Sequence, residues 1–331
     1  MIRDYILSGL PVGSEKITRK YRLNLSPATV RNIMASLERM GYLEQPHVSS
    51  GRIPTDRAFR HYVDALIDPK PLDRNVQKFI LDRFQYAVLD VGEIMQETSR
   101  ILSRVSHCAG VVSYPRISET VFDRIEFYRV DPERVLIVLI SQTGLLYHRI
   151  LEEVPGVSQQ ELKQAADYLN GRIRGLTLSE ARKRIMEQME KDRVQVRRIL
   201  ERFWNASAWD LERERTEVYI DGQNNILDYP EFSEDVRKMR GLLRAFEKKE
   251  VLLQLLKKAT EGEGTRVYIG QESQWDEMAG CSLIMSNYCR GGVSLGTLGI
   301  IGPKRMDYSW VIPLVEFAAK AVGEKLEQIG G

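Results

Sequence analysis

The sequence is short of the features that mark secreted, membrane-spanning and redox proteins. Its 331 residues include only three cysteines, Cys108, Cys281 and Cys289, which form no CxxC pair and no even set for a disulfide framework. The longest aliphatic run is VLIVLI at 135–140, far too short to span a membrane. The opening MIRDYILSGL lacks the layout of a signal peptide. These absences predict a cytoplasmic protein with reduced thiols and no membrane partner.

An excess of one charge is also absent. The formal net charge is only +2, so any binding to nucleic acid has to come from a local patch. Such a patch is possible in residues 1–67, where ten Lys and Arg stand against six Asp and Glu. The 43% of hydrophobic residues is ample for ordinary cores elsewhere in the chain.

Motifs for catalysis and cofactor binding are missing too. GVSLG at 292–296 matches the GxSxG pattern, but the sequence continues as TLGIIGP, which predicts that Ser294 lies in a strand and not at a nucleophile elbow. The chain has no P-loop, and Gly296, Gly299 and Gly302 have the wrong spacing for a dinucleotide loop. His107 and Cys108 are adjacent, so their side chains would point apart. We predict no enzyme activity, no metal site and no cofactor.

The order of predicted elements indicates several domains. Residues 1–67 are rich in helix, DPKPLDRN at 68–75 resembles a linker, and a long helix is expected over 76–105. Strands are predicted at 109–114, 121–130, 134–141 and 145–151, and again at 265–270, 282–289 and 293–301. A largely helical block separates the two groups, and a last helix is expected at 307–327. This pattern predicts an α+β domain interrupted by an insertion.

A helix with an unusual outward face is predicted over 26–40. Ser26 is a good N-cap, and Pro27 suits the first helical position. One face is apolar, formed by Val30, Ile33, Met34, Leu37 and Met40. The opposite face is small and hydrogen-bonding, with Ala28, Asn32, Ala35 and Arg39 flanked by Thr29, Arg31 and Ser36. A helix that enters a DNA major groove needs short side chains for close approach, together with Arg and Asn for bidentate contacts to bases.

Basic and hairpin-like segments flank this helix. A helix that begins at Ser14 offers cations for phosphates, and YLEQPHVSSGRIPT predicts two short strands around a polar turn, with Arg52 at the tip after a glycine of positive φ. Helix, turn, helix and hairpin is the order of a winged helix. The same order fits a small domain with a surface hairpin, or a winged helix used for protein contacts. The candidate DNA contacts are Lys16, Arg19, Lys20, Ser26, Thr29, Arg31, Asn32, Ser36, His47, Ser50 and Arg52.

The segment SPATVRNIMASLERMGYLEQPHVSSGRIPTDRAFRHYVD resembles the N-terminal signature of the bacterial HrcA family of heat-inducible transcription repressors. GQNNILDYPEF at 222–232, VYIGQE at 267–272 and GTLGIIGPKRMDYSWVIPLV at 296–315 are similar to later motifs of that family. The resemblance implies a winged-helix domain at 1–67, a GAF-like domain at 74–151 and 230–331, and an inserted dimerisation domain at 152–229. The apolar helical stripe over 178–203 and the aromatics Phe203, Trp204 and Trp209 lead us to expect the dimer interface in this insert.

The resemblance also implies a function and partners. It implies a homodimer that binds an inverted-repeat operator of the CIRCE type ahead of chaperone operons, releases it on heat stress, and depends on the GroE chaperonin. The alternative is a winged-helix regulator whose GAF-like domain binds a small molecule. Family members usually carry further residues before the stretch that matches IRDYILSGLPVGS. We therefore expect either an in-frame continuation of the first helix upstream of Met1 or a loosely held N-terminal domain.

Overall fold

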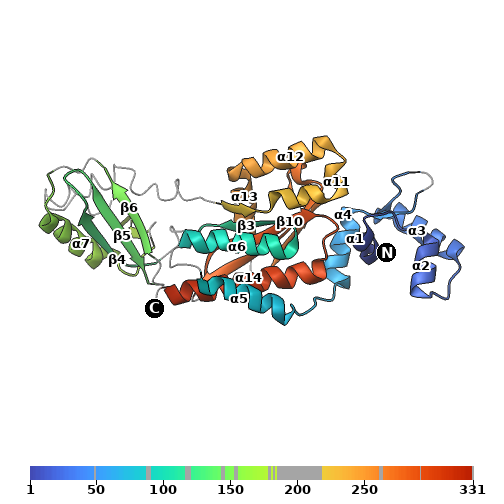
Figure 1. Ribbon diagram of the computed structural model, residues 1–331, viewed down its shortest axis with the longest axis horizontal. Helices are drawn as coiled ribbons and strands as arrows, with labels where there is room; N and C mark the ends of the chain where they lie inside the picture. Colours follow the sequence, from blue (N-terminus) through green and yellow to red (C-terminus); the bar gives the residue numbers. More distant parts are fainter. Residues whose placement is uncertain are drawn as a thin grey trace.

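The computed structural model describes residues 1–47, 50–86, 91–115, 121–142, 146–152, 156–177, 180–181, 183–184, 218–260, 264–290 and 292–329. Three units lie along the long axis of the molecule (Figure 1). An N-terminal unit lies at one end, a central unit is built on a five-stranded sheet, and a small unit at the other end carries a three-stranded sheet. Helices and sheets are mixed, which confirms the α+β class.

The N-terminal unit contains α1 (Ile2–Ser8), α2 (Ser14–Tyr21), α3 (Pro27–Arg39), α4 (Asp56–His61) and the π-helical turn η1 (Tyr62–Leu66). Between α3 and α4, the strands β1 (Leu43–Glu44) and β2 (Ile53–Pro54) pair antiparallel. Its own small core is formed by Val30, Met34 and Leu43. Residues 67–73, which contain most of the predicted linker, have no regular secondary structure.

The central sheet has the order β7-β3-β10-β9-β8, and every neighbouring pair is antiparallel. Its strands are β3 (Ala109–Ser113), β7 (Val218–Asp221), β8 (Arg266–Ile269), β9 (Cys281–Arg290) and β10 (Val293–Pro303). Ser294 therefore lies in a strand, as predicted. The outer strand β7 was predicted to belong to the insertion. Its pairing with β3 contradicts that boundary, because its backbone completes the central sheet.

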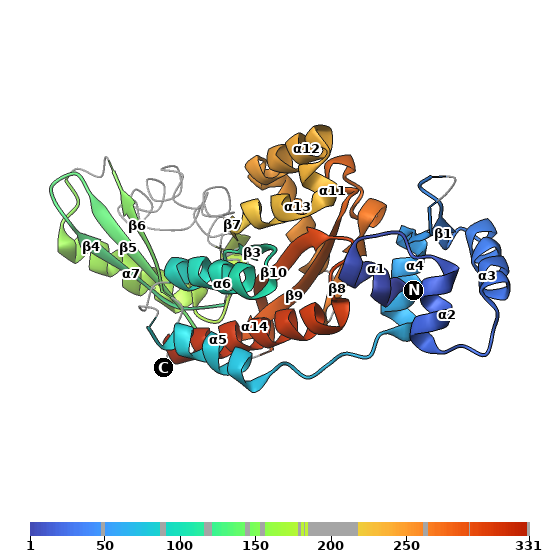
Figure 2. The same cartoon turned by 45° about the vertical axis from the view of Figure 1, so that its right-hand side comes forward.

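Helices cover both faces of the central sheet (Figures 1 and 2). On one side lie α6 (Val91–Ser106) and α14 (Tyr308–Ile329), which pack on alternate residues such as Val112 and Leu298. On the other side lie α12 (Val236–Glu247) and α13 (Lys249–Thr260), which pack on the strand residues that point to the opposite face, such as Val111 and Met285. This alternation follows from the two-residue period of a strand.

Shorter elements complete the central unit: α5 (Arg74–Tyr86), η3 (Gln223–Asp228), α11 (Pro230–Ser233), η4 (Gly270–Ser273) and η5 (Asp276–Met278). The helix expected at 76–105 is described as two helices, α5 and α6, on either side of 87–90. A side chain at Gly110 would collide with the backbone of α6, so the glycine allows this helix to approach β3.

The small unit is formed by β4 (Phe122–Arg129), β5 (Val135–Ser141), β6 (Leu146–Leu151) and α7 (Gln159–Ile173). The strands pair in the order β4-β5-β6, and among the described residues none of them pairs with a strand of the central sheet. A capping box between Ser158 and Glu161 begins α7, and the side chain of Asn170 bonds both backbone groups of Ile125. The predicted boundary at residue 151 is therefore wrong, because 122–151 forms a separate sheet with α7. The predicted stripe beyond residue 184, with Phe203, Trp204 and Trp209, lies outside the described residues.

Candidate nucleic-acid interface

Helix α3 begins as its sequence predicts. The Ser26 side chain accepts a hydrogen bond from the Thr29 amide at 3.0 Å, and Pro27 occupies the first turn. The Ser26 hydroxyl also lies 2.9 Å from the Thr29 hydroxyl. Ser26 and Thr29 therefore stabilise the start of α3 and remain exposed at its N-terminus, where the partial positive charge of the helix favours an anion.

The outward face of α3 is exposed and mainly polar. Arg31 and Asn32 are exposed, and among the described residues Arg31 has no ionic partner. Ser36 is half-buried and accepts a hydrogen bond from Arg39 at 3.0 Å. The prediction for the apolar face was partly wrong, because Ile33 and Met40 are 47% and 53% exposed. Only Val30 and Met34 are buried in α3, so fewer residues than expected hold this helix.

Ser50 closes the turn of the hairpin that follows α3. Its hydroxyl donates to the carbonyl of His47 at 2.7 Å, while its amide donates to the same carbonyl at 2.9 Å. The side chain of Gln45 donates to the carbonyl of Ser50 at 3.1 Å. His47 is exposed beside this turn. The adjacent 48–49 lie outside the described residues.

Arg52 is not at the tip of the hairpin, and that prediction is wrong. Its amide and carbonyl form an antiparallel bridge with Val12, at 3.0 and 2.9 Å. Its side chain is only 17% exposed, and Nε donates to Oε2 of Glu38 at 2.8 Å. Gly51 does not have the positive φ that we predicted. Instead, a Cβ at Gly51 would lie 2.5 Å from the backbone of Val12, so the glycine permits this close approach.

The three predicted phosphate contacts on α2 have different environments. Lys16 and Arg19 are exposed and have no ionic partner in the described part of the chain. Lys20 instead forms an ion pair with the carboxylate of Asp4 on α1, whose side chain is 1% exposed. Burial opposes ionisation of Asp4, but the hydrogen bonds from Lys20 and Tyr21 outweigh it and hold its pKa below the usual value. Lys20 therefore joins α2 to α1, a role that we had not predicted.

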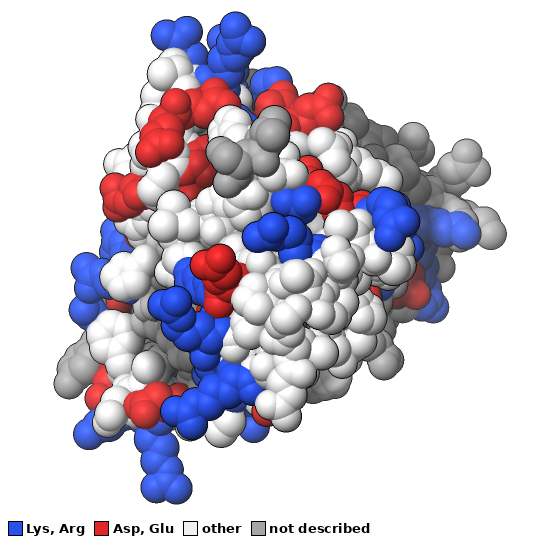
Figure 3. Space-filling model, turned by 90° about the vertical axis from the view of Figure 1, so that its right-hand side faces the viewer, with Lys and Arg blue, Asp and Glu red and all other residues white. Residues whose placement is uncertain are grey.

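A polar cleft of about 490 Å³ separates α2, α3 and the hairpin. It is lined by Arg31, Ser50 and Arg52 from our candidates, and by Ser14, Glu15 and Gln45. Seen from this end of the molecule (Figure 3), Lys and Arg are interspersed with acidic and uncharged residues and form no continuous field. This end of the molecule therefore presents separate cationic groups and not one continuous basic surface.

Three contributors to this surface were missed from the sequence. Glu38 holds Arg52, Val12 pairs with its backbone, and Gln45 supports the turn. The contacts of Arg52 with Glu38 and Val12 join distant segments and have no local signal. The contact of Gln45 with Ser50 spans only five residues, within the hairpin itself.

Metal-ligand clusters and membrane-spanning helices are both absent from the described part of the chain. No three His, Cys, Asp or Glu side chains are grouped there as metal ligands. No helix in the described part is both long enough and apolar enough to cross a membrane.

Comparisons with known proteins agree with the resemblance. The family model for the HrcA protein C terminal domain matches residues 92–312. A heat-inducible transcription repressor HrcA from Geobacter sulfurreducens is 43% identical over 99% of this chain and 95% of its own length. The same-named protein of Syntrophobacter fumaroxidans is 40% identical over 100% of this chain and 95% of its own.

Solved structures add a likeness in fold. A crystal structure described as that of a hypothetical protein matches with a TM-score of 0.61 and 20% sequence identity, over 99% of this chain and 96% of the other. With sequence matches of this length and identity, the chain belongs to the HrcA family.

Proposed function

We propose that this chain is a DNA-binding repressor of heat-inducible chaperone genes that acts as a homodimer on an inverted-repeat operator. The observation that carries the proposal is the exposed polar face of α3, which is followed by a hairpin in the order of a winged helix. The family membership supports repression as the activity, and it gives no support for an enzyme.

Sequence recognition is assigned to α3 and backbone contacts to its surroundings. Arg31 and Asn32 are exposed on one side of α3, and both can make two hydrogen bonds to a base edge. Lys16 and Arg19 on α2 have no ionic partner in the described residues, so both are free to contact phosphates. His47 and Ser50 present the hairpin turn, while Arg52 and Glu38 fix its angle to α3.

The homodimer is proposed to form through the face of the small sheet that α7 leaves uncovered. Register places three cross-strand rows on that face: Tyr128–Leu136–Ile150, Glu126–Val138–His148 and Arg124–Ile140–Leu146. Tyr128, Leu146 and Ile150 are exposed, which leaves a mostly apolar surface in contact with solvent. A two-fold axis through such a face would bring the same residues of two copies together, and it would match the symmetry of an inverted repeat.

Three further assignments follow from the family and are part of the proposal. The central unit corresponds to the GAF-like domain, the protein acts in the cytoplasm, and the GroE chaperonin keeps it active.

The alternative is a regulator that responds to a small molecule, and fractionated cell extract distinguishes it from the proposal. A low-molecular-weight fraction of cell extract would raise the melting temperature in that case, whereas a chaperonin-containing fraction would restore DNA binding under the proposal.

DNA selection and footprinting test the proposed function. The full chain, incubated with random duplexes, is expected to enrich an inverted repeat and to protect both halves. The Asn32→Ala variant should lose that enrichment while it keeps weak binding to all sequences. Enrichment of no sequence by the wild-type chain, or of a site without two-fold symmetry, would contradict the proposal.

A further inference from the structure

The short helix α4 contacts α3 with one set of side chains. The hydroxyl of Thr55, the residue that caps α4, donates to the carbonyl of Gly41 at 2.7 Å. Nη1 of Arg57 donates to the carbonyl of Met40, the residue that ends α3, at 2.8 Å. These bonds attach α4 to the end of α3, so the two helices are expected to move together.

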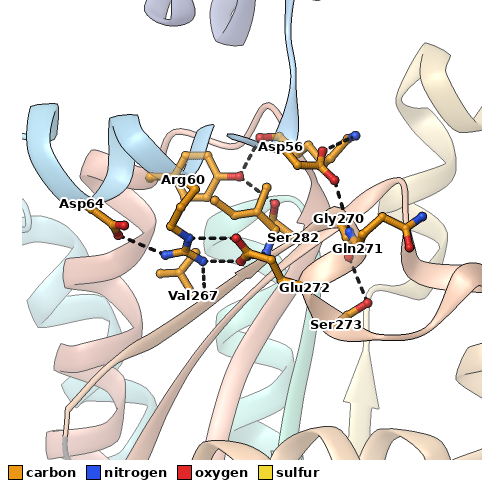
Figure 4. Close-up of polar contacts among 12 residues, drawn as sticks. Asp56, Arg60, Asp64, Val267, Gly270, Gln271, Glu272, Ser273 and Ser282 are labelled. Carbon is orange, nitrogen blue, oxygen red and sulfur yellow. Dashed lines mark hydrogen bonds and ion pairs between the residues drawn. The ribbon is translucent and has the colours of Figure 1, made fainter. Parts of the chain in front are cut away.

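A second set of α4 side chains contacts the central unit (Figure 4). Oδ1 of Asp56 accepts from Nζ of Lys304 at 2.6 Å, and Oδ2 accepts from the amide of Gln271 at 3.2 Å. Arg60 contacts both carboxylate oxygens of Glu272, with Nε at 2.9 Å from Oε1. We call Asp56, Arg60, Glu272 and Lys304 the α4 contact.

The neighbourhood of the α4 contact is tightly fitted. Arg60 also donates to the carbonyl of Val267 at 2.5 Å and to Asp64 at 3.1 Å, so each guanidinium nitrogen has an acceptor. A side chain at Gly270 would collide with the carboxylate of Asp56. Beside these pairs, the rings of Phe59 and Tyr308 lie 6.1 Å apart. A bidentate Arg–carboxylate pair fixes orientation as well as distance.

We propose that Asp56, Arg60, Glu272 and Lys304 are positioning residues for operator binding. They set where α3 lies relative to the central unit, and therefore how far apart the two α3 helices of a dimer are. Two half-sites on one face of B-DNA are separated by about 34–36 Å or a multiple of it, so a rigid dimer tolerates little change in spacing. This inference rests on the proposed dimeric, inverted-repeat function and adds the residues that determine spacing.

The organisation of the cores supports a separable role. Val30, Met34 and Leu43 form a cluster apart from the one that contains Phe59 and Tyr308. Ile6, Phe59 and Tyr62 of the N-terminal unit also belong to that second cluster, so apolar contact would keep the two units together after loss of the ion pairs. Apolar contact is not directional, so the orientation of the N-terminal unit is expected to loosen while α3 stays folded. Residues 67–73 would still tether the two units, partly through the Lys70 amide, which donates to Ser309 at 3.0 Å.

The test compares two matched variants of the full chain. Glu272→Gln, with Asp56→Asn, removes the charges that hold Arg60 and Lys304. Asp123→Asn is the control, because Asp123 pairs with Arg174 at 2.9 Å within the small unit and its side chain is 33% exposed, against 34% for Glu272. Each protein is titrated with the inverted-repeat duplex selected by the wild type, with derivatives lengthened by one to five base pairs between the halves, and with a single half-site.

The wild type and Asp123→Asn should lose affinity steeply as the halves are moved apart. Glu272→Gln with Asp56→Asn should bind the natural spacing about 5- to 50-fold more weakly, show a flattened spacing profile, and keep wild-type half-site affinity and melting temperature. A merely structural role would lower half-site affinity and melting temperature together.

A wild-type spacing profile in the Glu272→Gln, Asp56→Asn variant would overturn the inference. Hydrogen exchange of residues 67–73 is an independent readout: it should be faster in that variant and unchanged in Asp123→Asn, and equal exchange in both would also overturn the inference. A wild-type protein that binds one half-site as tightly as two would contradict the proposed function itself, and the exchange measurement would still decide the role of the α4 contact.

Discussion

The Nε atom of Arg52 donates to Oε2 of Glu38 at 2.8 Å, which ties the hairpin to the last turn of α3. Arg52 is also held at its backbone by Val12, so the residue connects three segments of the N-terminal unit. The hairpin therefore has a defined angle to α3 before any DNA is present, which lowers the ordering cost of binding.

The Glu38–Arg52 contact predicts that neutralising Glu38 weakens DNA binding, which is the opposite of what the loss of a negative charge alone would do. Removal of a carboxylate near DNA normally strengthens binding, because phosphates repel it. Glu38→Gln is expected instead to weaken operator binding by roughly 0.2–1 kcal/mol, since it frees Arg52 and the hairpin. The exposed Glu44, which has no ionic partner among the described residues, supplies the control. Electrophoretic titration should show weaker operator binding for Glu38→Gln and equal or stronger binding for Glu44→Gln. Stronger binding in both would contradict the positioning role of Glu38.

Asn32 and Lys16 should affect different properties of binding. Asn32→Ala is expected to reduce affinity for the selected operator by about 1–3 kcal/mol and to leave random DNA nearly unaffected. Lys16→Ala should weaken binding to every sequence alike and lower the slope of log affinity against log salt by about one. Fluorescence titrations at several salt concentrations measure both quantities. Lys163, exposed on α7, is the control cation. Equal losses on random DNA for both variants would refute the division of roles.

The Asp4–Lys20 pair predicts a dependence of stability on pH. The folded-state pKa of Asp4 lies below the usual value, because the hydrogen bonds from Lys20 and Tyr21 outweigh the effect of burial. Its stabilising contribution is therefore present above about pH 4, the pKa of an unfolded aspartate, and is lost as the pH falls through the folded-state pKa. Protection factors for hydrogen exchange across α1 and α2, which correct for the intrinsic pH dependence of amide exchange, should fall below pH 4 in the wild type. Asp4→Asn should show fast exchange already at pH 7, and a wild-type profile in that variant would exclude the pair as the cause.

The small sheet makes the dimer testable by a single surface change. Ile150 is exposed beside Leu136, so Ile150→Glu should leave the folded protomer intact while it places a charge in the proposed interface. Sedimentation should show a monomer that binds a single half-site only weakly. Lys163→Glu on α7 changes charge outside this face and should remain dimeric. If Ile150→Glu dimerises as strongly as the wild type, the dimer interface does not lie on this face of the small sheet.

Local features of the fold were predictable from the sequence, whereas contacts between distant segments were not. The capped start of α3 follows from Ser26 and Pro27, whose effects need only neighbouring residues. The prediction that Lys20 faces phosphates was wrong, because its partner Asp4 lies 16 positions away on another helix. No pattern in the neighbouring residues indicates such a partner. Arg52 was placed at a hairpin tip because its sequence neighbours indicated a turn and gave no sign of Val12 or Glu38. Polar pairs of this kind depend on how the helices pack.

The predicted domain boundaries near β6 and β7 differ from the observed ones for a related reason. The continuous apolar run of β5 is equally consistent with a strand in the middle of a large sheet and with one in a small sheet that has two apolar faces. Strand partners decide between these cases, and periodicity carries no information about partners. Likewise, β7 was assigned to the insertion because only its pairing with β3 shows that it belongs to the central sheet.

The three cysteines provide a last prediction, about reactivity. Burial raises the pKa of the Cys108 thiol to about 11 and that of Cys281 to about 12, whereas Cys289 is exposed. The thiolate is the reactive form, so at pH 8 the two buried thiols are almost fully protonated as well as inaccessible. Iodoacetamide followed by mass spectrometry should label Cys289 alone in the folded protein and all three residues in guanidinium chloride. Cys108 directly precedes β3 and Cys281 is the first residue of β9, so their labelling during heating would report when the central sheet opens. Rapid labelling of Cys281 at 25 °C in the folded wild type would contradict its burial at the end of β9.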